Sequence, residues 1–151
     1  MLLLIGLQWL GLALNFLLAW LFPAAAISTA RITLFLLSLA LIIFGTAFRW
    51  YAIRTLGPYF TRQVTVSTGQ PVVQRGPYRF IRHPAYAGTF LTMLGVGLAM
   101  TNWASLIALL CCVLIGHFNR VRIEEQALIR AIGQPYLDYM QRTRRFIPLL
   151  F

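Results

Sequence analysis

The sequence contains no lysine, only three acidic residues and only two cysteines, and these shortages narrow the class of protein. Charged residues make up 11% of the chain and apolar residues 60%. Soluble domains have roughly 25% charged and about 45–50% apolar residues. The composition therefore indicates an integral membrane protein.

Because lysine is absent, all the basic residues are arginines, and the formal net charge is +10. The arginines lie beside apolar segments and not on a soluble domain with base-reading or stacking elements, which argues against a nucleic-acid partner. Anionic lipid headgroups or an anionic ligand fit this distribution better.

The two cysteines, Cys111 and Cys112, are adjacent in an apolar run. Neighbouring cysteines cannot easily form a disulfide with each other, and no histidine or cysteine stands at a metal-ligand spacing from them. We interpret them as small buried hydrophobic residues and predict no metal site.

The chain also lacks any Pro/Gly/Ser-rich or low-complexity stretch that would divide it. Its 151 residues are enough for one compact bundle. We therefore expect a single domain over residues 1–151, with N-terminal spans in 1–48 and the cofactor-binding and catalytic part in 49–151.

Long apolar runs predict an all-α membrane fold with about four transmembrane helices, at residues 2–22, 32–48, 86–100 and 103–119. A span needs roughly 20 residues, so the third segment is short. The tight connection at 101–103 makes the last two segments a helical hairpin. The first segment lacks a basic start and an A-x-A-like cleavage site in the expected place, so we expect it to be a retained span.

The arginines also predict the orientation of the spans. If the N-terminus is cytoplasmic, the outer loops at 23–31 and 101–103 carry only Arg31. The cytoplasmic side then holds Arg49, Arg54, Arg62, Arg75, Arg79, Arg82, Arg120, Arg122, Arg130, Arg142, Arg144 and Arg145. This pattern follows the positive-inside rule, and it places both termini and the segment 76–88 on the cytoplasmic side.

The segment 76–88, GPYRFIRHPAYAG, is typical of a binding site at a helix start. A residue before proline avoids the α region and proline suits a first helical turn, so we predict that His83 is the N-cap of the third span. The N–H groups of that turn favour a carboxylate or phosphate. Gly88 would let a ligand approach closely, and Tyr78 and Tyr86 offer ring faces and hydroxyls.

A plainer interpretation of this segment is that its arginines and tyrosines only anchor the chain at the membrane interface. His83, on that interpretation, is a helix cap and nothing more. The sequence by itself leaves both interpretations of the segment open.

The helix of the fourth span is predicted to continue to Ile132 and to end at Gly133 and Pro135, before a short terminal element. On a helical wheel of about 100° per residue, Glu124 falls on the apolar stripe, opposite the face that carries Arg122, Gln126 and Arg130. An ionised group on that stripe is costly unless it is paired.

Arg120 precedes Glu124 by one helical turn and is a possible partner for it. The pair is either a helix-surface ion pair of little energetic value or part of a site for a zwitterion. In a zwitterion site the ammonium of the ligand would meet Glu124, and its carboxylate would meet basic groups.

Four motifs in order resemble the isoprenylcysteine carboxyl methyltransferase family and its phospholipid methyltransferase relatives. They are G-P-Y-x-x-x-R-H-P-x-Y-x-G at Gly76–Gly88, R-x-x-x-E-E at Arg120–Glu125, G-Q-P-Y-x-x-Y at Gly133–Tyr139 and R-x-I-P at Arg145–Pro148. The resemblance covers about residues 63–148.

The resemblance implies a membrane enzyme that uses S-adenosylmethionine in a cytosolic pocket, closed by the loop and the C-terminal helix. It places around the cofactor Gln63, Gln70, Pro71, Val72, Val73, Tyr78, His83, Pro84, Ala85, Tyr86 and Glu124, to which the helix-start argument adds Gly88. It also implies that Arg120 contacts the acceptor, so the expected catalytic residues are Arg120 and Glu124.

The resemblance favours O-methylation of a protein-S-isoprenylcysteine carboxylate. The acceptor is a membrane lipid or a lipidated small molecule or peptide, and a phosphatidylethanolamine-type amine is an alternative. Membrane reductases that use NADPH are similar in R-H-P-x-Y-x-G and Y-x-x-Y, although the short chain and the adjacent Glu124 and Glu125 argue against one. A non-enzymatic module that binds anionic lipid is a further alternative.

Overall fold

The computed structural model describes residues 2–60 and 70–146, and the elements within these ranges are helices joined by turns. The long helices are α1 (Leu2–Leu21), α2 (Arg31–Leu56), α3 (Pro84–Ala99) and α4 (Trp103–Ile132), and α5 (Gln134–Arg142) follows. Short 3-10 turns occupy Pro23–Ala25 (η1), Gly57–Tyr59 (η2) and Gly76–Arg79 (η3). The predicted all-α fold is confirmed.

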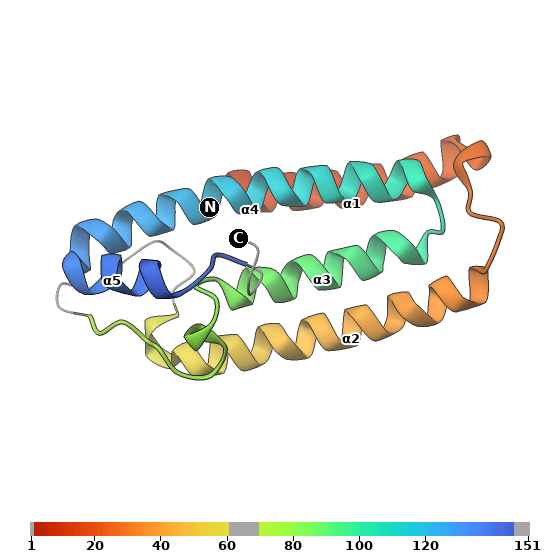
Figure 1. Cartoon of the computed structure of the whole chain (residues 1–151). Coiled ribbons are helices and arrows are strands. Elements are labelled where there is room, and N and C mark those ends of the chain that lie inside the picture. Colours follow the sequence, from red (N-terminus) through yellow and green to blue (C-terminus); the bar gives the residue numbers. More distant parts are fainter. Residues whose placement is uncertain (1, 61–69, 147–151) are drawn as a thin grey trace.

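The four long helices form two antiparallel pairs, α1 with α4 and α2 with α3 (Figure 1). The pairs meet where α3 packs on α4, which gives the hairpin expected from the sequence. Helices α1, α2 and α4 are long and apolar enough to cross a membrane. Helix α3 has 16 residues, about 24 Å at 1.5 Å per residue, less than the ~30 Å hydrocarbon core of a bilayer.

A polar cap fixes the turn between α3 and α4. Thr101 has a positive φ of 46°, and the side chain of Asn102 accepts a hydrogen bond from Ser105 N at 3.1 Å. The Nδ2 group of Asn102 donates to Phe22 O at 2.9 Å, so the same residue holds the end of α1 against the start of α4. An Asn at the N-cap satisfies a backbone N–H that would otherwise lack a partner.

Close approach of α2 and α3 depends on glycine. A Cβ on Gly88 would lie 2.8 Å from Arg49 N and 2.8 Å from Gly45 O, distances that only glycine avoids. Gly88 therefore packs against α2. The sequence argument that Gly88 lets a ligand approach the first turn of α3 is not supported, because α2 already occupies the space beside it.

The interpretation of both cysteines as buried residues was wrong for Cys111, which is exposed on α4. Cys112 is partly buried and would lie 3.0 Å from a Cβ on Gly11 of α1. The difference follows from the helical period, since consecutive residues point about 100° apart and only one of two neighbours can face the partner helix.

The C-terminal part of α4 extends beyond the N-terminal start of α1 and leads into α5, which lies across that end of the bundle (Figure 1). Its C-cap, Gly133, has a φ of 72°, so the predicted end at Gly133 is confirmed. After α5 the chain pairs with the start of α3, where Arg82 N donates to Arg144 O at 2.7 Å and His83 N donates to Arg145 O at 3.0 Å. The C-terminal segment therefore closes this end of the molecule.

Candidate active site

A cavity of about 510 Å³ lies at the end of the bundle that α5 covers, within the range of small-molecule sites. Its polar walls come from the chain before η3, from η3, from the first turns of α3 and from the distal half of α4. Its apolar walls come from α1, α2 and the end of α4, including Leu4, Ile5, Trp50, Ile53 and Leu128. The cavity thus joins a polar end to the faces of apolar helices.

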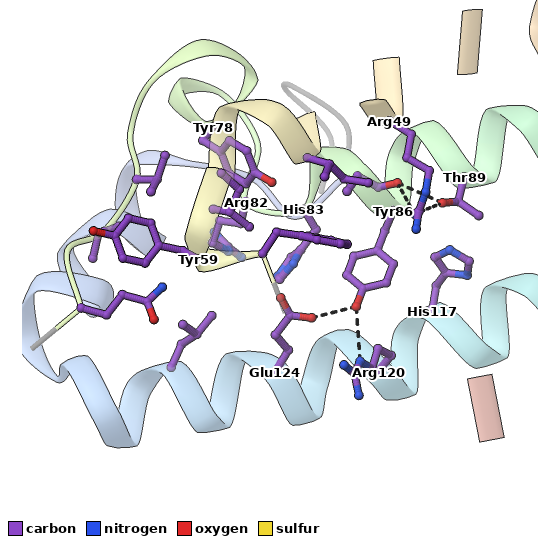
Figure 2. Close-up of a pocket in the computed structure, with 18 of the residues that line it drawn as sticks. Arg49, Tyr59, Tyr78, Arg82, His83, Tyr86, Thr89, His117, Arg120 and Glu124 are labelled. Carbon is purple, nitrogen blue, oxygen red and sulfur yellow. Dashed lines mark hydrogen bonds between the residues drawn. The ribbon is translucent and has the colours of Figure 1, made fainter. Parts of the chain in front are cut away.

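Tyr86 links the two charged residues that the sequence singled out. Its hydroxyl donates to Glu124 Oε2 at 2.8 Å and accepts from Arg120 Nε at 3.3 Å (Figure 2). Arg120 is buried, and Glu124 is partly buried on the cavity wall. Helix α4 presents both side chains because they are one turn apart, and α3 supplies the hydroxyl between them.

The neighbouring carboxylate, Glu125, has a different environment. It is 4% exposed and accepts from Arg82 Nε at 3.0 Å, lies 3.2 Å from His83 Nε2, and pairs with Arg145 Nη2 at 2.8 Å. These contacts join α4, the start of α3 and the C-terminal segment. Glu125 therefore holds the closing segment in place, while Glu124 faces the cavity.

The two arginines of the segment 76–88 also differ in environment. Arg79 is exposed beside the Phe80 ring, as expected for an interface anchor. Arg82 donates through Nη1 to Met140 O at 3.0 Å and to Thr143 O, in addition to its bond to Glu125. Only Arg79 fits the interface interpretation.

Three tyrosines surround the polar end of the cavity. Burial, together with nearby Glu124, raises the pKa of Tyr78, and burial with nearby Glu125 raises the pKa of Tyr136. Burial raises the pKa of Tyr139 to about 12, and its hydroxyl donates to Tyr78 O at 2.8 Å. All three remain protonated near neutral pH, so they can donate hydrogen bonds.

Most of the residues expected around the site line the cavity: Gln70, Pro71, Val72, Val73, Tyr78, His83, Ala85, Tyr86, Arg120 and Glu124. His83 is the N-cap of α3, as predicted, but its side chain makes no capping hydrogen bond. Pro84 is buried in the first turn and Gly88 packs on α2, so neither is part of the cavity wall. Gln63 lies outside the described residues.

Other polar residues of the cavity were missed from the sequence. Gln8, Arg49, Thr89, His117 and Tyr136 all line it. Arg49 and His117 were detectable in principle, because each is a polar residue next to or within a long apolar run. Tyr136 stood in the G-Q-P-Y motif, but its sequence position does not show that its ring lies over the cavity.

The fold and the site define an integral membrane protein with a ligand pocket at one end of its helices. The chain belongs to the isoprenylcysteine carboxyl methyltransferase (ICMT) family, whose sequence model matches residues 37–130. The resemblance seen in the motifs is therefore confirmed.

The chain is similar to curated members of the family. It is 31% identical over 114 residues to protein-S-isoprenylcysteine O-methyltransferase B of Arabidopsis thaliana, over 74% of this chain and 58% of that protein. It is 31% identical over 116 residues to protein-S-isoprenylcysteine O-methyltransferase of Tribolium castaneum, over 76% of this chain and 41% of that protein. The chain thus matches about half the length of these relatives.

The fold is similar to a solved structure of the eukaryotic intramembrane Ras methyltransferase ICMT. The TM-score is 0.77 at 28% sequence identity, and the match covers 97% of this chain and 52% of that chain. Nearly the whole chain therefore has a counterpart in that structure.

Proposed function

We propose that the protein is a methyltransferase that transfers the methyl group of S-adenosylmethionine to the carboxylate of a lipophilic, isoprenylcysteine-like acceptor at the membrane. The observation that supports this most strongly is the Glu124–Tyr86–Arg120 cluster, which lies in a cavity that also has apolar walls from α1, α2 and the end of α4. Relatives named protein-S-isoprenylcysteine O-methyltransferase support the same reaction.

The residues at the polar end fit a zwitterionic nucleoside cofactor. The Tyr136 hydroxyl is buried and has no partner among the described residues, and a buried donor of this kind is costly unless a ligand satisfies it. Glu124 supplies a carboxylate for an ammonium group, and Tyr78 supplies a ring face. We assign the segment Gln70–Val73, which lines the cavity before η3, to the remaining wall of the same subsite.

S-adenosylmethionine held in this subsite would supply a methyl group on a sulfonium sulfur. An acceptor oxygen would displace that sulfur, with a C–O bond formed and the S–C bond broken. A carboxylate attacks in its ionised form, so no residue has to remove a proton. The residues of the chain act by alignment and proximity. Arg120 would hold the acceptor carboxylate, and the Tyr86 hydroxyl keeps its guanidinium in position.

The apolar part of the cavity suits a hydrocarbon chain. Leu4 and Ile5 of α1, Trp50 and Ile53 of α2, and Leu128 of α4 form its walls. Burial of an acceptor chain there would contribute about 25 cal/mol per Å² of apolar surface. We therefore infer that the acceptor enters with its lipid part between helices and its carboxylate towards Arg120.

We further infer that the cavity and both termini are on the cytoplasmic side. Arg31 lies at the far end of α2, where the loop from α1 enters, whereas α5 and the cavity lie at the opposite end (Figure 1). The positive-inside rule then assigns the arginine-rich end to the cytoplasm.

Calorimetric titration of the purified protein in detergent tests the cofactor assignment, with S-adenosylhomocysteine and NADPH as ligands. Saturable binding of S-adenosylhomocysteine alone is the expected result. Transfer of a labelled methyl group is then compared between N-acetyl-S-farnesylcysteine and phosphatidylethanolamine. Binding of NADPH alone, or transfer only to the amine, would refute the proposal.

A further inference from the structure

His117 is a buried polar residue that the methyl-transfer chemistry leaves without a role. It is 4% exposed, lies in α4 three residues before Arg120, and lines the cavity. Its Nδ1 atom is 2.7 Å from Val113 O. Because a carbonyl oxygen only accepts, Nδ1 carries the hydrogen in this contact.

The other ring nitrogen of His117, Nε2, is buried and has no partner among residues 2–60 and 70–146. An imidazolium at this buried position would be a second cation in a cavity that Arg49 also lines, and a buried charge without a counter-ion is costly. The ring is therefore neutral, and Nε2 has a lone pair. A buried acceptor without a donor costs free energy unless a ligand supplies one.

The position of His117 relative to the acceptor end of the cavity is fixed by Tyr86. The two rings meet edge to face with centroids 5.3 Å apart, and the hydroxyl of Tyr86 contacts both Arg120 and Glu124. Figure 2 shows His117 on the side of the Tyr86 ring away from Glu124. A ligand group bound to His117 would thus lie across the Tyr86 ring from Arg120 and Glu124, the two residues assigned to methyl transfer.

Arg49 brings a cation to the same part of the cavity. Its Nη1 group donates to Ala85 O at 3.2 Å and to the Thr89 hydroxyl (Figure 2). Among the described residues, every hydrogen bond of this guanidinium starts from Nη1. The N–H groups on Nε and Nη2 are left for a ligand, because guanidinium has five donors and no acceptor.

We propose that His117 and Arg49 form a subsite that recognises a secondary amide of the methyl acceptor. The amide N–H donates to His117 Nε2, and the amide C=O accepts from Arg49. An amide has one hydrogen-bond donor beside one hydrogen-bond acceptor. It can therefore donate to the neutral Nε2 atom of His117 and accept from the guanidinium of Arg49. This inference rests on the proposed function and deepens it, because it assigns two residues to the amide that an N-acylated cysteine carries beside its carboxylate.

Two methyl acceptors distinguish recognition of an amide by His117 from simple packing of its ring against Tyr86. N-acetyl-S-farnesylcysteine has the amide, and S-farnesylthiopropionic acid lacks it but keeps the lipid and the carboxylate. Their dissociation constants are measured with S-adenosylhomocysteine present, so that no methyl transfer occurs. We expect the natural protein to bind the amide acceptor about tenfold more tightly, as one buried hydrogen bond would give.

Substitution of His117 tests the assignment directly. His117→Phe keeps a ring against Tyr86 but has no hydrogen-bond acceptor. The ratio of the two dissociation constants is expected to fall to near unity in this variant. In His117→Gln, whose side-chain oxygen can accept, the ratio is expected to recover in part. Thermal unfolding of each variant reports whether the fold is intact.

The two proposals fail in different ways. Discrimination that depends on His117, in a protein that methylates neither acceptor, would support the amide subsite and refute the proposed reaction. Equal dissociation constants for the two acceptors in the natural protein would refute the subsite without any variant. Absence of binding by both acceptors, or a ratio unchanged in His117→Phe, would also refute it.

Discussion

At the scale of single residues, the two adjacent glutamates have opposite roles. Glu124 lies on the cavity wall and has a hydrogen bond from Tyr86. Glu125 is buried and contacts Arg82, His83 and Arg145. Consecutive helical residues point about 100° apart. The Glu124 carboxylate of α4 therefore faces the cavity, and the Glu125 carboxylate faces the C-terminal segment. The same substitution at each position should therefore affect different properties.

Glu124→Gln should weaken binding of S-adenosylhomocysteine by more than tenfold, because it removes the carboxylate that pairs with the ammonium of the ligand. Calorimetry measures the dissociation constant. Asp138→Asn is the matched control, since this carboxylate is on α5, bonds to the Gln134 side chain at 2.8 Å and is not on the cavity wall. An unchanged constant in Glu124→Gln would exclude this residue from the cofactor subsite.

Arg120→Ala should reduce turnover or acceptor affinity more than cofactor affinity, because the guanidinium is assigned to the acceptor carboxylate. Steady-state kinetics with varied acceptor, alongside calorimetry of S-adenosylhomocysteine, gives both quantities. Arg122→Ala removes the same charge from an exposed position and should change neither by much. A loss confined to cofactor binding would contradict the acceptor role of Arg120.

At the scale of elements, closure of the site depends on contacts between segments that are far apart in the sequence. Arg82 and Glu125 are 43 residues apart, and Tyr139 and Tyr78 are 61 residues apart. The C-terminal segment adds backbone hydrogen bonds to the start of α3. Helix α5 and this segment are therefore fixed by Glu125 and by α3 together.

Glu125→Gln should lower stability by about 3 kcal/mol, because removing one partner of a buried ion pair leaves the other charge uncompensated. Arg82 is the charge concerned, with a side-chain exposure of 9%. Thermal unfolding in detergent measures the loss. Glu124→Gln is the control, and its smaller effect on unfolding is part of the expectation. Equal losses in the two variants would contradict the structural role of Glu125.

Gly88→Ala should push α3 away from α2 and lower the unfolding temperature, because the new Cβ would lie 2.8 Å from backbone atoms of Arg49 and Gly45. The cavity walls move with these helices, so affinity for S-adenosylhomocysteine should fall as well. Gly6→Ala is the matched control, since a Cβ at Gly6 meets nothing within 4 Å. Similar unfolding temperatures for the two variants would rule out the close-approach role of Gly88.

At the scale of the whole molecule, arginines and apolar helices define a direction across the membrane. Helix α5 and the described C-terminal segment share one end of the molecule, and the turns around η1 and residues 101–103 share the other (Figure 1). The lining residues place the cavity at the end with α5. The cation distribution orients this axis by the positive-inside rule. On this orientation, we expect the proposed reaction to take its soluble cofactor from the cytoplasm and its lipophilic acceptor from the bilayer.

Cysteine labelling in intact cells tests this orientation, with Cys111 and Cys112 replaced by alanine. A membrane-impermeant maleimide should label Ala25→Cys without permeabilisation, because the loop after α1 is predicted to face outward. Arg142→Cys, at the end of α5, should react only after permeabilisation. The opposite labelling pattern would show that the predicted orientation is wrong. The cavity would then lie on the side of the membrane away from the cytoplasmic cofactor.

The structure also shows which features local sequence rules could predict. His83 as N-cap follows from the proline after it, and the end of α4 follows from Gly133 and Pro135. The face of α4 with Arg122 is exposed, as the helical wheel predicted. Each of these features depends on a residue and its neighbours within about one turn, so the sequence contains the necessary information.

Features that depend on a partner helix were missed or misassigned. Gly88 was read as a ligand contact because the sequence does not show that α2 lies beside it. Glu125 was given no role from the sequence, because its cationic partners are brought to it only by folding. His117 and Arg49 gave no motif, and their shared position in the cavity depends on how α2 and α4 lie around α3.

The sequence by itself determined the class of protein, the apolar helices and the family motifs, because composition and short-range periodicity specify these. The direction across the membrane stays a prediction from the arginines. Only the tertiary structure decided which cations surround Glu125, where Gly88 packs and that the Nε2 atom of His117 has no partner among the described residues. Those outcomes depend on side chains that meet across tens of residues, and the geometry of such contacts is set by helix packing and not by local preference.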